Sequence, residues 1–161
     1  MMRLFDEFQE ALAGVAYRLA CGTPYVDGSL PTLLTAPANS TAAARDLFEN
    51  HGRAKPQYVK WSKVTFINDT IKHVISGTDP FSLACNANAN VISEMQAVRN
   101  RIAHKNTGSR AGFAKVVRSR YGAALNSMSP GLLLLTPKFS PPLLHQYVAS
   151  CRLIAKDCAR A

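Results

Sequence analysis

Residues 91–104 read Val-Ile-Ser-Glu-Met-Gln-Ala-Val-Arg-Asn-Arg-Ile-Ala-His. Four apolar residues in this run recur at steps of four, three and four: Val91, Met95, Val98 and Ile102. That spacing places side chains on one face of an α-helix. The polar run at 86–90 supplies capping residues before the helix, and Gly108 marks the break after it. The stretch therefore predicts an amphipathic helix whose buried stripe ends at Ile102.

Three- and four-residue spacing of apolar side chains predicts further helices on both sides of this one. Their expected ranges are 3–21, 41–51, 57–76, 111–125 and 141–160. Prolines and glycines in 22–39 predict a long surface loop, whereas Leu132–Leu135 fits either a short extended piece or a packed loop. No segment sustains the two-residue alternation of a strand. We therefore expect an all-α bundle of about five or six helices, forming one domain over residues 1–161.

Charge is distributed unevenly along the chain. Residues 1–94 hold eight Lys or Arg and nine Asp or Glu, whereas residues 95–161 hold eleven Lys or Arg and a single acid, Asp157. Such an excess of one sign suits a polyanionic partner such as nucleic acid, although a basic surface also serves solubility. No apolar run reaches the ~20 residues that span a bilayer, and the N-terminus lacks the order of a signal peptide. We expect a soluble, cytoplasmic protein with no membrane partner.

The four cysteines, Cys21, Cys85, Cys151 and Cys158, are scattered and form no zinc-binding pattern. We interpret them as small buried apolar residues in a reducing compartment. The sequence also lacks a phosphate-binding loop, a Gly-x-Ser-x-Gly nucleophile motif and paired carboxylates for two-metal chemistry. We expect neither a metal nor a cofactor.

Chemistry-bearing side chains follow the apolar stripe of the helix at 91–104. Asn100 and His104 are four residues apart and share a helical face. Arg99 lies about 140° around an ideal helix from His104, so the two converge only if the helix frays or tightens, or if the arginine reaches across. A histidine can move a proton on or off a ribose or leaving oxygen, a guanidinium can hold phosphate oxygens, and an amide can orient either group. Glu94 either orients Arg99 or supports the start of the helix, and His104 taken alone would serve as a C-terminal helix cap.

This combination of residue types suits cleavage of a phosphodiester. Polar and basic side chains nearby are candidates for holding an RNA backbone: Arg101, Lys105, Asn106, Arg110, Lys115, Arg118 and Arg120. Such contacts would be independent of sequence and sensitive to salt. Phe113 and Tyr121 have helical spacing, which is more typical of core residues than of base-stacking ones.

The run Arg99-Asn100-Arg101-Ile102-Ala103-His104 resembles the Arg-Asn-x-x-x-His signature of the HEPN superfamily. The following Lys105-Asn106-Thr107-Gly108 looks similar to the HEPN subgroup called RiboL-PSP, as, less specifically, does the segment from Trp61 to Phe81. The resemblance implies a helical bundle, a homodimer that brings two motifs into one cleft, and metal-independent cleavage of RNA to 2′,3′-cyclic phosphate and 5′-hydroxyl ends. It assigns catalysis to Arg99 and His104, and a tuning role to Asn100.

Three hypotheses follow from these observations. The first is a dimeric endoribonuclease acting on single-stranded or loop RNA, as a toxin or antiviral defence effector that an acidic antitoxin or regulatory partner could mask. The second is a non-catalytic HEPN module that binds nucleotide, RNA or a partner protein. The third is a helical interaction protein in which the motif is accidental. The first two hypotheses are distinguished by whether replacing His104 abolishes RNA cleavage while RNA binding persists.

Overall fold

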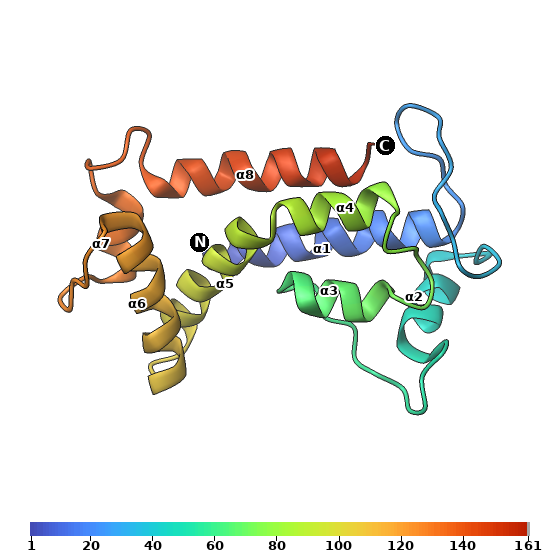
Figure 1. The fold of residues 1–161 in the computed structure, drawn as a ribbon, viewed down its shortest axis with the longest axis horizontal. Helices are drawn as coiled ribbons and strands as arrows, with labels where there is room; N and C mark the ends of the chain where they lie inside the picture. The colour runs from blue at the N-terminus through green and yellow to red at the C-terminus, as the bar shows by residue number, and fades with distance from the viewer. Residues whose placement is uncertain (161) are drawn as a thin grey trace.

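The computed structural model describes residues 1–160, which form eight α-helices (Figure 1). The helices are α1 (Met2–Ala20), α2 (Thr41–Asn50), α3 (Val64–Ile71), α4 (Pro80–Ala87), α5 (Ala89–Ala103), α6 (Thr107–Tyr121), α7 (Pro130–Leu135) and α8 (Leu143–Cys158). Within the described residues, strand-like pairing is limited to one isolated antiparallel bridge between Leu33 and Ile75. The predicted all-α class is confirmed, with more helices than the five or six expected.

Three helices run side by side through the middle of the molecule: α1, α4 and α8 (Figure 1). Helix α5 continues from α4 and packs against α1 and α6, so that α6 and α7 form one end of the molecule, while α2 and the long loops lie at the other. All eight helices contribute side chains to one continuous buried cluster. None of the described helices combines the length and the apolar character needed to cross a membrane.

Two helices that the apolar spacing did not predict begin with the same local signal. Asp79 caps α4 by accepting a hydrogen bond from the Phe81 amide at 3.0 Å, and Pro80 is the first helical residue. Ser129 caps α7 in the same way and is also followed by a proline, Pro130. A proline is favoured at the first helical position because its missing N–H would have no partner there. Leu132–Leu135 therefore belongs to a helix, which corrects both the extended and the loop interpretation.

The predicted helix over 57–76 is wrong at both ends, because only Val64–Ile71 is helical. The segment before it packs an aromatic ring instead: Trp61 lies edge-on to Tyr17 and Phe48, with ring centroids 5.9 and 6.0 Å away. Lys60 exchanges backbone hydrogen bonds with the Thr70 hydroxyl, which holds the segment alongside α3. Burial of one large ring and these side-chain contacts replace the helix that the sequence spacing favoured.

The turn between α5 and α6 also differs from expectation. Helix α5 ends at Ala103, and Asn106 caps α6 by accepting the Ser109 amide at 2.8 Å. Gly108 consequently lies inside the first turn of α6 rather than at a break, and Gly122, with φ of 73°, ends that helix. The predicted helix over 111–125 is thus displaced by about one turn. The buried face of α5 is formed by Ile92, Met95, Gln96 and Val98, whereas Ile102 is 40% exposed.

Asp79 also fixes the long loop against the helices. Its carboxylate accepts hydrogen bonds from the buried Tyr25 hydroxyl and, at 2.7 Å, from the Thr32 amide. Both partners belong to the loop that precedes α2, so one buried carboxylate joins this loop to the start of α4. A buried acid is tolerated because its oxygens are satisfied by these donors.

Replacing Tyr25 with Phe removes one donor from a buried carboxylate and keeps the ring. We expect Tyr25→Phe to lower the free energy of unfolding by about 1.5–3 kcal/mol, the range for hydrogen bonds to charged groups. Tyr58→Phe is the matched control, because the Tyr58 side chain is 78% exposed and should leave stability unchanged. Urea denaturation followed by circular dichroism measures both, and equal stabilities would contradict this role of Asp79.

The thiols should differ sharply in reactivity. Cys85 and Cys158 are fully buried with their Sγ atoms 3.7 Å apart, and this contact together with burial raises the pKa of Cys158 well above its usual range. Burial raises the pKa of Cys151 to about 11. Cys21 is only partly buried. Because the thiolate is the reactive form, we expect iodoacetamide to label Cys21 first in the native protein and all four thiols only in denaturant, as mass spectrometry would show.

Candidate functional site

A polar groove of about 910 Å³ runs between α5 and α6. Its walls carry amide, hydroxyl, imidazole and ammonium groups, contributed among others by Lys63, Asn90, Ser93, Gln96, Asn100, His104, Asn106, Ser109, Lys115 and Ser119. Gly112 of α6 also lines the groove, and an added Cβ there would meet that of Ala97 at 3.8 Å, so the two helices approach closely at this point. The groove is large enough for a small-molecule or nucleotide ligand, for which volumes of ~300–1,000 Å³ are typical.

The end of α5 places Asn100 and His104 on this groove. His104 leaves the helix in an extended conformation, with φ of −132° and ψ of 129°, while its amide still donates to the Asn100 carbonyl at 2.8 Å. The Ser109 hydroxyl of α6 donates to the His104 carbonyl, which fixes the turn. The imidazole is exposed. Two of the three residues of the Arg-Asn-x-x-x-His run are therefore brought together in one cavity.

Arg99 lies on a different side of α5. Its guanidinium faces α1, where Nη2 is 3.5 Å from the Asp6 carboxylate, and its side chain is 27% exposed. The buried Nε of Arg99 has no hydrogen-bond partner within residues 1–160. The helix does not tighten before His104 in the way that would draw the two side chains together. Arg99 is therefore not among the residues that line the groove, whereas His104 is.

Glu94 is held by Arg120 and Tyr147 and makes no contact with Arg99. Its carboxylate accepts two hydrogen bonds from the Arg120 guanidinium, at 2.6 and 2.9 Å, and one from the Tyr147 hydroxyl at 2.7 Å. The hydrogen bond to Glu94 raises the pKa of Arg120, and burial raises the pKa of Tyr147 beyond its usual range. The arginine therefore stays charged and the phenol stays protonated. This three-residue contact, the Glu94 triad, joins α5, α6 and α8 along one wall of the groove.

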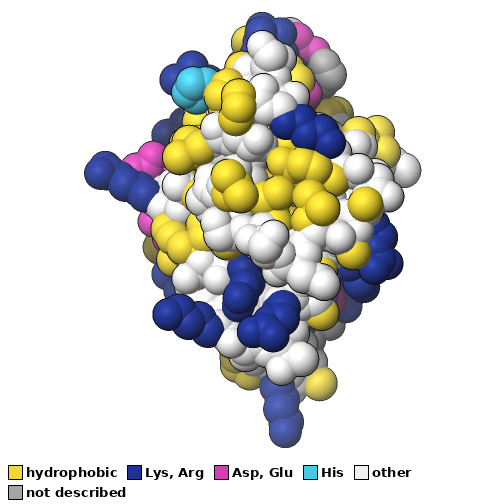
Figure 2. Space-filling model, turned by 90° about the vertical axis from the view of Figure 1, so that its left-hand side faces the viewer, with side chains coloured by type: hydrophobic (Ala, Val, Ile, Leu, Met, Phe, Trp, Pro, Cys, Tyr) yellow, Lys and Arg dark blue, Asp and Glu magenta, His cyan; other side chains and the backbone are white. Residues whose placement is uncertain are grey.

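The other predicted RNA contacts divide into groups. Asn106 and Lys115 line the groove, whereas Arg101 of α5 and Arg110 of α6 line a separate pocket of about 420 Å³ together with the buried Phe113. Lys105 and Arg118 are exposed, and Arg120 is already paired with Glu94. Figure 2 shows Lys and Arg side chains around an apolar area on this end of the molecule.

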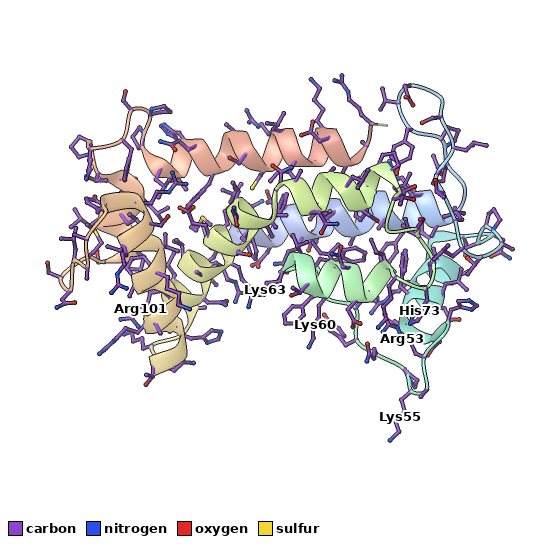
Figure 3. The ribbon with its side chains drawn as sticks, viewed as in Figure 1. Arg53, Lys55, Lys60, Lys63, His73 and Arg101 are labelled. Atoms are coloured by element: carbon purple, nitrogen blue, oxygen red, sulfur yellow. The ribbon has the colours of Figure 1, made fainter. Side chains whose placement is uncertain are left out.

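Sequence reasoning missed the groove residues that come from outside the motif. Lys63, at the start of α3, lies beneath α5 and lines the groove (Figure 3). Gln96 is 9% exposed and donates to the Ser62 hydroxyl at 3.1 Å, which holds the residue before Lys63 against α5. Lys63 is not among the expected site residues, because one long helix is expected over 57–76 and no residue of it stands out from a regular helical surface.

The groove combines a proton-transfer group with cationic and hydrogen-bonding groups. His104 contributes an imidazole, a group that can act as a proton donor or acceptor, while Lys63 and Lys115 can hold anionic oxygens from two walls. Glu94 is the only carboxylate among the lining residues of the described chain, and Arg120 neutralises its charge. Within residues 1–160, no group of three His, Cys, Asp or Glu side chains is arranged to hold a metal ion. The site thus favours an anionic ligand.

Replacing Glu94 with Gln tests whether the triad holds the groove together. We expect Glu94→Gln to lower the free energy of unfolding by about 1–3 kcal/mol, because it leaves the partly buried Arg120 without a counter-charge. Glu7→Gln is the control, since the Arg3–Glu7 pair is 92% and 60% exposed and solvent screens it. Thermal or urea unfolding of the two variants gives the comparison. Equal destabilisation would contradict a special role of the triad.

Comparison of the whole chain with known proteins gave no matching family model, no matching curated protein and no matching solved structure. The function is therefore inferred from the residues of this chain and their geometry. Those residues place an imidazole, an amide and two ammonium groups around one cavity between α5 and α6.

Proposed function

We propose that this protein is a metal-independent endoribonuclease that cleaves single-stranded or loop RNA, with HEPN-type chemistry at a homodimer interface. One observation carries the proposal: Asn100 and His104 line a polar groove together with Lys63 and Lys115. The groove has the charge that a phosphodiester needs, because Arg120 neutralises its only lining carboxylate among the described residues. As part of the same proposal, the protein acts as a toxin or antiviral effector, and an acidic antitoxin or regulatory partner would mask the basic surface.

In the proposed reaction, the ribose 2′-oxygen attacks the neighbouring phosphorus and the 5′-oxygen leaves. One proton is removed from the 2′-hydroxyl and one is delivered to the 5′-oxygen, giving a 2′,3′-cyclic phosphate and a 5′-hydroxyl. A histidine can perform either transfer, but one imidazole cannot be base and acid at the same moment. A second copy of the motif supplies the other His104. Asn100 orients the imidazole or the phosphate.

Arg99 has the role of holding the phosphate oxygens as charge develops on them. Its position facing Asp6 agrees with this role only if it acts on a phosphate held at a dimer interface, or after it leaves Asp6. The contact with Asp6 is long at 3.5 Å and lies near the surface. Such pairs contribute about 1 kcal/mol or less, so a phosphate competes with Asp6 easily.

The second candidate function is a non-catalytic module that binds nucleotide, RNA or a partner protein. The orientation of Arg99 favours this alternative, because the residue that should hold the phosphate pairs with α1 in the single chain. The two functions differ in whether the groove residues are needed for bond cleavage or only for binding.

Cleavage of a generic single-stranded RNA in the presence of EDTA decides between the two functions. We expect the wild-type protein to leave 2′,3′-cyclic phosphate ends, and His104→Ala and Arg99→Ala each to lose at least about a hundredfold in rate, the usual worth of a positioned acid–base or charge-stabilising group. The control is Arg152→Ala, an exposed cation on α8 away from the groove, which should cleave normally.

RNA binding by the same variants completes the test. Retained binding with lost cleavage supports catalysis by these residues, and sedimentation of the wild-type protein should show a dimer. Equal behaviour of the wild-type protein and both variants, whether all are silent or all cleave, would remove the catalytic assignment and leave the binding module as the better description.

A further inference from the structure

Another hollow, distinct from the groove and from the pocket beside Phe113, lies on the outer side of α3. It has a volume of about 390 Å³ and is lined by Tyr58, Lys60, Phe66 and their neighbours. Lys63 connects the two cavities, because it lines the groove and its ammonium lies 5.8 Å from the centre of the Phe66 ring. We call the four residues Tyr58, Lys60, Lys63 and Phe66 the aromatic ledge. Figure 3 shows both lysines on the same side of the molecule.

The two aromatic rings of the ledge are unusually exposed. Tyr58 is 78% exposed and Phe66 is 38% exposed, whereas five of the other phenylalanines in the described chain are buried. Tyr58 comes from the segment that joins α2 to α3, and Phe66 comes from α3 itself. Neither ring belongs to the buried core. An exposed ring in a chain that buries its other rings so well indicates a surface available for stacking.

Cations interleave with these rings. The Lys60 ammonium is 5.2 Å from the centre of the Phe66 ring, and Lys63 approaches the same ring. The carboxylate that borders the hollow, Asp69, is paired with Lys72 at 2.7 Å and with Arg53 at 3.7 Å, so it does not cancel the charge of the ledge. Both ledge lysines are exposed and carry flexible stems, so that each ammonium can move from a ring face onto a neighbouring anion.

We propose that the aromatic ledge binds single-stranded RNA, with bases stacked on Tyr58 and Phe66 and backbone phosphates on Lys60 and Lys63. This inference rests on the proposed ribonuclease function and extends the path of the strand from the groove, past Lys63, onto the outer face of α3. Every base has a π-face, so stacking of this kind tolerates any sequence. An apolar protein surface would instead bury two lysines without a counter-charge, which is costly.

The test measures binding in a His104→Ala background, so that its outcome does not depend on cleavage. Fluorescence anisotropy compares an oligouridylate with an abasic strand of the same length. We expect Tyr58→Leu with Phe66→Leu to bind the oligouridylate about tenfold or more weakly, since each stacked base is worth that much, and to bind the abasic strand as the parent protein does. Tyr58→Phe keeps a ring and should bind normally. Leu83→Ala, which alters an exposed apolar residue of α4, is the matched control.

The lysines give a second, independent measurement. Replacing both Lys60 and Lys63 with Met should reduce the slope of log affinity against log salt by about 1.4, as expected for two lost phosphate contacts on a single strand. Equal binding of the oligouridylate by the parent and by the double leucine variant overturns the ledge, as does equal affinity of the parent for base-bearing and abasic strands. If cleavage by the wild-type protein persists in that case, the ledge fails while the ribonuclease function stands.

Discussion

The contact between Glu94, Arg120 and Tyr147 is the constraint on which the site depends. It joins the consecutive helices α5 and α6 to α8. The charged pair is formed by Glu94, 17% exposed, and Arg120, 30% exposed, and the Tyr147 phenol is buried. A carboxylate that accepts three hydrogen bonds fixes both the distance and the relative orientation of the side chains that donate them. The groove between α5 and α6 keeps its width because α6 is tied to α5 on one wall and both are tied to α8. The same contact removes the negative charge that would otherwise repel a phosphate.

The turn after α5 places His104 at the groove between α5 and α6. Because the helix ends at Ala103 and Asn106 begins α6, the chain reverses within three residues and His104 stands in the turn. A histidine one turn earlier would lie on the helix surface, and one turn later it would enter α6. The capping hydrogen bond of Asn106 and the bond from Ser109 to the His104 carbonyl hold this reversal. Local helix-capping chemistry thus decides where the imidazole lies.

Much of the fold could be predicted from apolar spacing, and the failures have a common origin. The expected ranges for α1, α2 and α8 agree with the structure to within about two residues, the usual uncertainty of helix ends. The expected ranges include no helix between 76 and 91, although an acid followed by a proline, Asp79-Pro80, begins α4. The motif helix and the positions of Asn100 and His104 also followed from the sequence. Lys63 and the ledge could not, because their proximity to the groove depends on how Trp61 packs against α1 and α2.

Arg99 and His104 belong to the same Arg-Asn-x-x-x-His run but lie on different sides of α5, and this separation limits how they could act on one phosphate. Side chains five residues apart point about 140° from each other on a regular helix, and α5 stays regular through Arg99. An arginine that faces α1 and an imidazole that faces α6 cannot hold the same phosphate without rearrangement or a second chain. The single chain therefore contains a polar groove lined by His104 but not by Arg99, and the proposed catalysis requires a second copy or a displaced Asp6 to complete the site. In the proposed reaction dimerisation is part of the chemistry, because a second copy would add both a second proton-transfer group and a second guanidinium.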